Sequence, residues 1–514
     1  MDARAYEGPA VVLHGGTVRT LDAARPTAAA VVVRGDRIAA VLDDARDAPA
    51  GASRVDLQGG CLLPGFTDAH VHFPAWALAR RELQLQDAAS LAEAVDRIAR
   101  AAAGTPPGTW LRGRGWRRER WGADDEPTRA TLDAVTAGVP VALRAHDGHS
   151  LWLNSAGLAW AGGDLDTRGG VVERDAAGEP TGILREEAAW RFEARAEPGA
   201  TETLRAVRDA LPAAAAAGVV AIHDKDGGRH APELFAALRD EGALALRVWQ
   251  SLPAEGLAGG AEPDLHGGLL RIGYVKAFMD GTLGSRTARL LDGTGVEITS
   301  RAALEEIVRR ASAAGFAVAV HAIGDLANRE ALDAFEATRE HWQPRGLRPR
   351  IEHAQCVHPD DVPRFARLGV AASVQYTHAT SDRDVADRLW GDRAAHAYPY
   401  ASLLAAGALL AGGSDAPVEA LDPLAGLRAA VLRTDGERPP WRPEQAIGLG
   451  AALASFTTGP AWLAGEEHVR GRIAPGLLAD LVVLDRDPVA GLEDARVAGT
   501  MLAGEWTLTP PGSA

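Results

Sequence analysis

The chain has 514 residues, 46% of them hydrophobic, and a formal net charge of -15 at pH 7. This length predicts a large domain plus at least one smaller unit, because a single hydrophobic core stops growing at about 250–300 residues. Charges of both signs are scattered along the chain without a basic stripe, which excludes nucleic acid as a partner.

The cysteine content and the apolar stretches indicate the cellular compartment of the protein. Cys61 and Cys356 are its two cysteines, too few for a disulfide framework and suited to a reducing compartment. The N-terminal residues lack the charged and then apolar pattern of an export signal. The longest apolar stretches, such as residues 211–222, fall short of the roughly 20 residues of a membrane span. We expect a cytoplasmic protein without a membrane role, whose acidic surface permits a homodimer.

Alternating apolar segments at both ends of the chain predict one small β-sandwich. They lie within residues 10–60 and again from Gly471, and glycine and aspartate punctuate them as in strands and hairpins. Two strand-rich ends around a long middle indicate that both ends join in one domain. We assign residues 1–62 and 469–514 to it.

The middle of the chain, residues 63–468, predicts an α/β fold, a TIM-type (β/α)8 barrel. Buried strand segments alternate there with helical stretches such as 301–314, 327–339 and 359–368. The eight segments are GFTDAHVHF, GVVAIHD, LALRVWQSL, IGYVKAFMD, FAVAVHAIGD, RIEHAQ, VAASVQY and ALLAGGSDAP. In such a barrel the active site lies at the C-terminal ends of the strands.

The connection between the first two predicted strands is unusually long. It has about 140 residues, whereas an ordinary βα connection has only a few. We therefore expect an insertion subdomain after the first strand, at about 76–215. It contains the strand-like WLRGRGW and VPVALRAHDGHS, and we expect it to cover the barrel mouth.

Residues that can bind metal end five of the predicted strands. His70 and His72 alternate with Val71, so the period of two places both rings on one face. A histidine pair of this kind, taken alone, is as easily explained by a structural role as by metal binding. The same position in later strands holds further polar side chains, which makes chance a poor explanation. The candidate ligands are His70, His72, Lys276, His321, His353 and Asp415.

Lysine is rare in this chain. It occurs only at Lys225 and Lys276, so 52 of the 54 basic residues are arginine. A retained lysine is a candidate for chemistry that a guanidinium cannot perform, and the alternative is chance survival of two surface lysines. Burial beside cations would lower the pKa of Lys276 and favour the neutral amine that carbon dioxide carboxylates.

Imidazole and carboxylate ligands at one barrel mouth indicate metal-dependent hydrolysis. A bound metal lowers the pKa of water to about 7, and two metals about 3.5 to 4 Å apart can share the nucleophile. This donor set suits zinc best, with manganese, iron or nickel as alternatives. The sequence predicts one or two divalent metals in each chain.

Several motifs resemble the amidohydrolase superfamily, in particular its N-substituted formamide deformylase-like (YtcJ-like) branch. They are GFTDAHVHF, VKAFMDGTLGSRTA, HAIGDLAN, RIEHAQ, GGSDAP, GRIAPGLLADLVVLD and, in the insertion, DGHSLWLNSAGL. The resemblance spans nearly the whole chain. It implies a hydrolase acting on carbon-nitrogen bonds other than peptide bonds, with a small amide as substrate.

The resemblance also implies a role for each candidate ligand. His70 and His72 would hold one metal and His321 and His353 a second, with Lys276 bridging them as a carbamate. Asp415 would bind metal and act as general base and then general acid. In a version with one metal, Lys276 would be a plain cation near the carbonyl oxygen.

Other residues have a functional and a structural interpretation. Asp280 and Arg286 either contact substrate or form an Asp-Gly turn with an ion pair. His149 and Asn154 could reach substrate, although asparagine also begins helices. Trp116 could line the pocket, although core packing is the usual role of tryptophan.

Three residues beside the candidate ligands are expected to stay outside the metal site. His223 is predicted to be a buried, hydrogen-bonded histidine, with support of a ligand as the alternative. Alternation along the strand predicts that Glu352 faces away from the barrel interior. The same alternation argues against Cys356 as a ligand.

Two other functions fit parts of this pattern. The same scaffold could serve a deaminase or a cyclic-amide hydrolase, which acts on a ring. A non-catalytic relic of the fold would be expected to have lost ligands, and all six are present. Fold alone decides none of these, because one barrel hosts many reactions.

Overall fold

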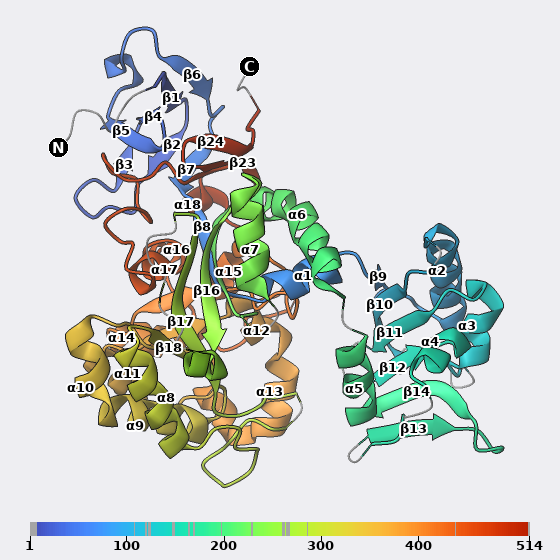
Figure 1. Cartoon of the computed structure of the whole chain (residues 1–514). Coiled ribbons are helices and arrows are strands. Elements are labelled where there is room, and N and C mark those ends of the chain that lie inside the picture. The colour runs from blue at the N-terminus through green and yellow to red at the C-terminus, as the bar shows by residue number, and fades with distance from the viewer. Residues whose placement is uncertain are drawn as a thin grey trace. The chain divides into compact units, whose positions relative to one another are not determined.

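The computed structural model contains two compact units, one of residues 1–76 with 207–514 and one of residues 77–206 (Figure 1). The structure describes residues 8–511 except 107, 119–120, 122–124, 146–149, 163–164, 168–169, 197, 228–229, 260–262, 264–267, 285 and 437. No helix of this described part is both long and apolar enough to cross a membrane.

Eight parallel strands form the central sheet, and they are the eight predicted from the sequence. In chain order they are β8 (Phe66–Val71), β15 (Val219–Asp224), β16 (Arg247–Pro253), β17 (Leu270–Phe278), β18 (Ala317–Ala322), β19 (Arg350–His353), β20 (Ala371–Val374) and β21 (Leu410–Gly412). The segment after β21 returns to β8, where the backbone N–H of Asp415 donates to the carbonyl of His70 and that of His72 to Ala416, at 2.7 and 2.9 Å. The predicted barrel is confirmed.

Helices follow most of the barrel strands. They include α7 (Ala231–Asp240), α8 (Arg301–Ala313), α9 (Asp325–Ala337), α11 (Val362–Leu368), α12 (Tyr376–Ser381), α13 (Arg383–Trp390), α14 (Tyr400–Ala405), α15 (Pro423–Leu432), α16 (Leu449–Ser455) and α17 (Thr458–Leu463). The side chain of Ser300 caps α8 by accepting from the N–H of Ala303. Helical cover on the outside explains why the strands read as continuous apolar runs: every residue of β15 and β18 is buried.

Strands from both chain ends share one sheet. Its order is β24-β23-β22-β7-β2-β3, and a second sheet has the order β5-β4-β1-β6. The N-terminal strands are β1 (Ala10–His14), β2 (Thr17–Arg19), β3 (Thr27–Ala28), β4 (Ala30–Arg34), β5 (Arg37–Leu42), β6 (Ser53–Asp56) and β7 (Cys61–Pro64); the C-terminal ones are β22 (Leu481–Leu484), β23 (Val497–Leu502) and β24 (Glu505–Leu508). Leu62 and Leu481 are fully buried between these sheets in one hydrophobic cluster. Figure 1 shows the blue and red strands together.

The second unit, residues 77–206, follows β8 and has its own sheet and core. The sheet order is β13-β14-β12-β11-β10-β9. Its elements are β9 (Leu83–Gln84), α2 (Leu91–Gly104), β10 (Leu111–Trp116), α3 (Arg129–Thr136), β11 (Val141–Ala145), β12 (Ser150–Leu153), α4 (Ser155–Trp160), β13 (Gly170–Arg174), β14 (Pro180–Glu186) and α5 (Glu187–Arg195). Trp116, Trp121 and Trp152 pack against one another in its core, with ring centroids 6.1 to 6.3 Å apart.

Candidate metal centre

One pocket of about 370 Å³ opens at the C-terminal ends of the barrel strands. All six candidate ligands contribute to its lining, although they come from the ends of four different strands and from the segment after β21. They are His70, His72, Lys276, His321, His353 and Asp415. The fold therefore gathers these residues from more than half of the chain into a single cavity.

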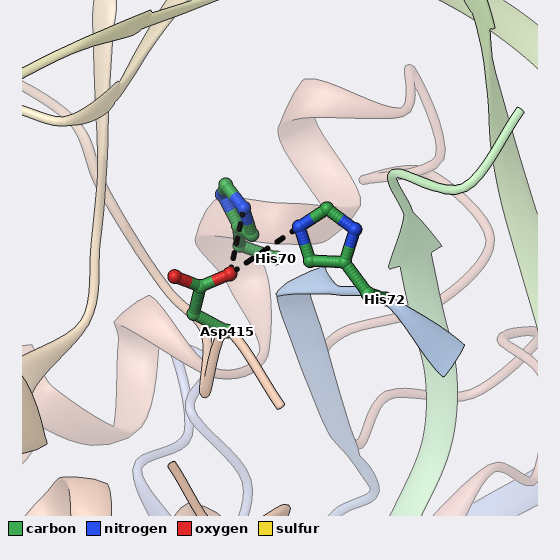
Figure 2. A group of neighbouring side chains, drawn as sticks. All are labelled: His70, His72 and Asp415. Atoms are coloured by element: carbon green, nitrogen blue, oxygen red, sulfur yellow. Dashed lines mark ion pairs between the residues drawn. The ribbon is translucent and has the colours of Figure 1, made fainter. Parts of the chain in front are cut away.

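His70, His72 and Asp415 form the first group of ligand atoms (Figure 2). The Nε2 atoms of His70 and His72 lie 3.2 and 3.5 Å from Oδ1 of Asp415. Both rings point toward the carboxylate, and the group is small enough for one ion to touch all three residues. Nε2 of His70 is buried and has no hydrogen-bond partner among the described residues. An unpaired, buried lone pair beside a carboxylate is the arrangement that a divalent cation satisfies.

The backbone around Asp415 explains how the carboxylate reaches this place. Asp415 has a left-handed backbone, with φ +59°, which is uncommon outside glycine and is retained where function requires it. Gly413 allows the close approach to β8, because a Cβ there would lie 2.5 Å from the backbone nitrogen of His70. Ser414 adds a hydrogen bond from its N–H to Asp68, 3.0 Å away.

The charges in this group favour a cation. Burial alone would raise the pKa of Asp415, but the neighbouring imidazoles of His70 and His72 hold it well below its usual range. Burial alone would lower the pKa of His72, but hydrogen bonds to Asp226 and Asp415 raise it to about 10. Asp226 and Asp415 thus place two carboxylates around one imidazole, and a metal ion would supply the positive charge they favour.

A second group consists of His353, His378 and Asp415. Nε2 of His378 lies 3.8 Å from Oδ2 of Asp415, and the rings of His353 and His378 are nearly parallel with centroids 6.2 Å apart. His378 is absent from the candidate ligands predicted by sequence. It stands on α12, directly after β20, so its place behind a predicted barrel strand was the signal that could have revealed it.

Hydrogen-bond acceptors stand behind the imidazoles of the first group. Nδ1 of His70 donates to Oε2 of Glu352 at 2.8 Å, and Nδ1 of His72 donates to Oδ1 of Asp226 at 2.7 Å. A metal ion that takes the place of a proton on Nε2 would bind the lone pair of that atom while Nδ1 keeps its proton. These bonds orient the rings for metal binding in the way that carboxylates support metal-bound histidines in general.

Acceptors also stand behind His321 and His353. Nδ1 of His353 lies 2.8 Å from Oε1 of Gln375, and Nε2 of His321 lies 3.1 Å from the carbonyl oxygen of Gly281. His353 therefore presents Nε2, whereas His321 presents Nδ1. The ring centroids of His321 and His353 are 4.4 Å apart.

Glu352 faces the barrel interior, so the prediction that it faces away was wrong. It is fully buried, and its carboxylate bonds His70, Lys225 at 2.8 Å and Arg350 at 2.9 Å. Alternation along β19 does place Glu352 and His353 on different faces. The left-handed backbone of His353, with φ +73°, turns that side chain back into the pocket at the end of the strand.

The two lysines of the chain are both buried close to the pocket. Lys276 is 5% exposed, and burial, with the charge of Arg350, lowers its pKa to about 8. Its Nζ lies 4.6 Å from the ring centroid of Phe278. Lys225 lies deeper and pairs with Glu352. Neither lysine is a chance survivor on the surface.

His223 and Cys356 lie outside both groups of ligand atoms. His223 is fully buried inside the barrel, where Nη1 of Arg350 donates to its Nδ1 at 2.7 Å. Burial and the charge of Arg350 hold its pKa well below the usual range. Cys356 is buried, and burial raises the pKa of its thiol, which leaves it a poor metal ligand.

The loop after β17 borders the pocket through residues other than those predicted. Thr282, Leu283 and Gly284 line it. Asp280 is fully buried and accepts hydrogen bonds from the backbone N–H groups of Arg289, Ile323 and Gly324, so it fixes the loop. Arg286 is exposed. Neither Asp280 nor Arg286 belongs to the described lining of this pocket, and a substrate contact of either residue stays a prediction.

In the second unit, the structure gives Asn154 and Trp116 structural roles. The Asn154 amide accepts from the N–H groups of Val141 and Gly157 and donates to Thr136 and Val139. It thereby caps α4 and has no capacity left for substrate. Trp116 is a core residue whose Nε1 donates to the carbonyl of Leu143. His149, the third predicted contact there, lies outside the described residues.

Comparisons with known proteins agree with this barrel fold. The model of the Amidohydrolase family matches residues 54–507. YtcJ of Bacillus subtilis is 32% identical over 85% of this chain and 86% of its own length. The N-substituted formamide deformylase of Arthrobacter pascens is 30% identical over 93% of this chain and 94% of its own. A metal-dependent hydrolase of Pyrococcus furiosus, solved by crystallography, shares 28% identity with a TM-score of 0.79, covering 93% and 100% of the two chains.

Fold and site thus define a metal-dependent hydrolase built on a TIM-type barrel. The chain belongs to the amidohydrolase family, whose model covers most of its length.

Proposed function

We propose that this protein hydrolyses a linear carbon-nitrogen bond in a small amide or N-substituted formamide. The observation that carries the proposal is the sharing of Asp415 between two histidine groups at the mouth of the barrel. A carboxylate in that position can both contact a metal and exchange a proton with a reacting group. The similarity to an N-substituted formamide deformylase over nearly the full length of both chains supports the substrate class.

The ligands fit one or two divalent ions, and zinc suits their imidazole and carboxylate donors best. His70, His72 and Asp415 would hold the first ion. His321 and His353 would hold a second, with Lys276 bridging after its amine has added carbon dioxide and released a proton. With a single ion, Lys276 would remain a cation near the carbonyl oxygen. When bound, the metal lowers the pKa of water and polarises the scissile carbonyl.

Asp415 performs the proton transfers in this proposal. Its Oδ1, already within 3.5 Å of both histidines of the first group, accepts a proton from the attacking water. The same oxygen then returns that proton to the nitrogen as the carbon-nitrogen bond breaks, so that an amine and a carboxylic acid, which keeps the second proton of the water, leave. Glu352 and Asp226 keep the two rings in place through these steps.

Metal analysis combined with a substrate panel tests the proposal. Protein purified without chelator is assayed for metal by plasma mass spectrometry, and amine release is followed on N-substituted formamides, linear amides, cyclic amides and aminoheterocycles. We expect bound metal and release from the formamides or linear amides. Turnover of the ring substrates alone would favour a deaminase or cyclic-amide hydrolase, and absence of metal would overturn the proposal.

Replacement of Lys276 by alanine decides the number of metals. A bridged pair predicts close to two metals per chain, falling sharply in Lys276→Ala. Lys276→Arg is the matched control, because it keeps a cation that cannot be carboxylated. One metal, unchanged in both variants, would contradict the carbamate and support the site with a single ion.

A further inference from the structure

Five histidines line the pocket, and four share one feature. Each donates one ring N–H to an acceptor, which leaves the other ring nitrogen with a free lone pair. The acceptors are Glu352 behind His70, Asp226 behind His72, Gln375 Oε1 behind His353 and the Gly281 carbonyl behind His321. The fifth, His378, differs from the others.

The partner of His378 is a donor. Nε2 of Gln355 lies 3.2 Å from Nδ1 of His378, so the amide donates and Nδ1 accepts. Gln355 is 4% exposed, and its Oε1 has no partner among the described residues.

An imidazole that accepts at Nδ1 carries its proton at Nε2. Nε2 of His378 is buried, with no hydrogen-bond partner among the described residues, and the side chain lines the pocket. Its distance of 3.8 Å from Oδ2 of Asp415 is too long for a hydrogen bond. A protonated Nε2 has no lone pair for a metal, but it can donate to a molecule in the pocket.

We propose that His378 is a hydrogen-bond donor to the carbonyl oxygen of the substrate, and that it does not bind metal. The inference rests on the proposed amide hydrolysis. When the water oxygen bonds to the carbonyl carbon, the π electrons move to the carbonyl oxygen, which accepts the Nε2–H bond more strongly. When the carbon-nitrogen bond breaks, the carbonyl re-forms and Nε2 keeps its proton. No proton is transferred through His378.

Three variants test this role in the metal-loaded protein. His378→Ala removes the donor, His378→Gln places an amide N–H near the position of Nε2, and Gln355→Glu puts an acceptor behind the ring. We expect unchanged metal content in the two His378 variants. For the formamide best hydrolysed by the wild type, kcat falls about 10²–10³-fold in His378→Ala with little change in KM, the usual cost of losing one oxyanion donor. His378→Gln recovers part of that loss.

Gln355→Glu distinguishes a hydrogen-bond donor at position 378 from a histidine with only a structural role. A carboxylate there draws the ring proton to Nδ1, so we expect kcat to fall as in His378→Ala while the metal content stays the same or rises. His341→Ala, which changes a histidine with 38% side-chain exposure, is the matched control.

Two outcomes would overturn the inference alone, and a third would overturn it together with the proposed function. Loss of a metal equivalent in His378→Ala, but not in His341→Ala, would make His378 a ligand. Equal kcat in wild type and His378→Ala would remove the carbonyl contact. A metal-loaded wild type that hydrolyses no member of the panel would overturn the proposed function, and the carbonyl contact with it, whatever the metal content of the variants.

Discussion

Oε2 of Glu352 lies 2.8 Å from Nδ1 of His70, although the two residues come from β19 and β8, and both side chains are buried. The same carboxylate also pairs with Lys225 and Arg350. One buried anion thus links a candidate metal ligand to the charged interior of the barrel. Its removal should affect both metal binding and stability.

Replacing Glu352 by glutamine should weaken metal binding about 10–100-fold, the usual effect of losing a residue that orients a metal ligand. Lys225 and Arg350 would also lose their buried counter-charge, and breaking a buried pair costs about 3–5 kcal/mol. Metal titration and urea unfolding measure the two effects. Glu340→Gln, at a carboxylate with 83% side-chain exposure, should change neither, and wild-type metal affinity in Glu352→Gln would contradict the positioning role.

Asparagine at position 415 should abolish most of the activity. The variant keeps the size of the side chain but cannot take a proton, so kcat should fall about 10²–10⁴-fold, the range of general acid-base catalysis. Steady-state kinetics of amine release measure it. Asp360→Asn is the control, because the Asp360 side chain is 84% exposed. Near-normal kcat in Asp415→Asn would assign the proton transfer to another group.

Removal of metal should destabilise the barrel. The first ligand group joins β8 to the segment after β21, so a bound ion cross-links the first and last strands. A ligand at 100 times its Kd stabilises the folded state by about 2.7 kcal/mol. Chelator-treated protein should therefore melt at a lower temperature and regain its Tm when zinc is returned. An identical Tm in both states would argue against an ion in this group.

Replacing Asn154 by alanine should lower stability without affecting substrate binding. Loss of the helix cap alone costs about 0.5–2 kcal/mol, and the neighbouring backbone N–H groups lose their acceptor as well. Urea unfolding checks the first effect, and KM on the folded fraction checks the second. A KM raised several-fold in a fully folded variant would restore the substrate contact expected from the sequence.

Both thiols should be unreactive in the folded protein. Burial raises the pKa of Cys61 from 9.0 to about 12, and that of Cys356 also rises. At about pH 8 a chromogenic aryl disulfide should react slowly with native protein and rapidly with the unfolded chain, because only a thiolate attacks. An unfolded Cys61 loses its proton first, so stability should fall as the pH rises from about 9 toward 12. Cys61→Ala should reduce this slope, and fast labelling of native protein would contradict the burial.

The barrel and the candidate ligands could be predicted from the sequence for one reason. A strand covered on both faces is an apolar run, so a histidine, lysine or aspartate at its end is conspicuous, as in VKAFMD or HAIGD. His321 and Lys276 were recognisable in this way. Their shared pocket then follows from the parallel direction of the strands.

The side-chain directions and site residues that the sequence did not predict depend on local backbone geometry and on partners distant in sequence. Alternation predicts side-chain direction only while a strand lasts, and His353 and Asp415 both leave their strands through left-handed residues. For that reason Glu352 was predicted on the wrong face. His378 was missed because it follows β20 on a short helix, and Asp226 because its role is visible only beside His72.

The pairing of β7 with β22 also has a consequence for synthesis. β7 immediately precedes β8, which carries His70, and its neighbour β22 begins at Leu481, near the end of the chain. Because the ribosome synthesises the chain from its N-terminus, β7 cannot pair with β22 until residues 65–480 have been synthesised. The strand leading into the first candidate metal ligands therefore gains this neighbour only after the whole barrel between them has been synthesised.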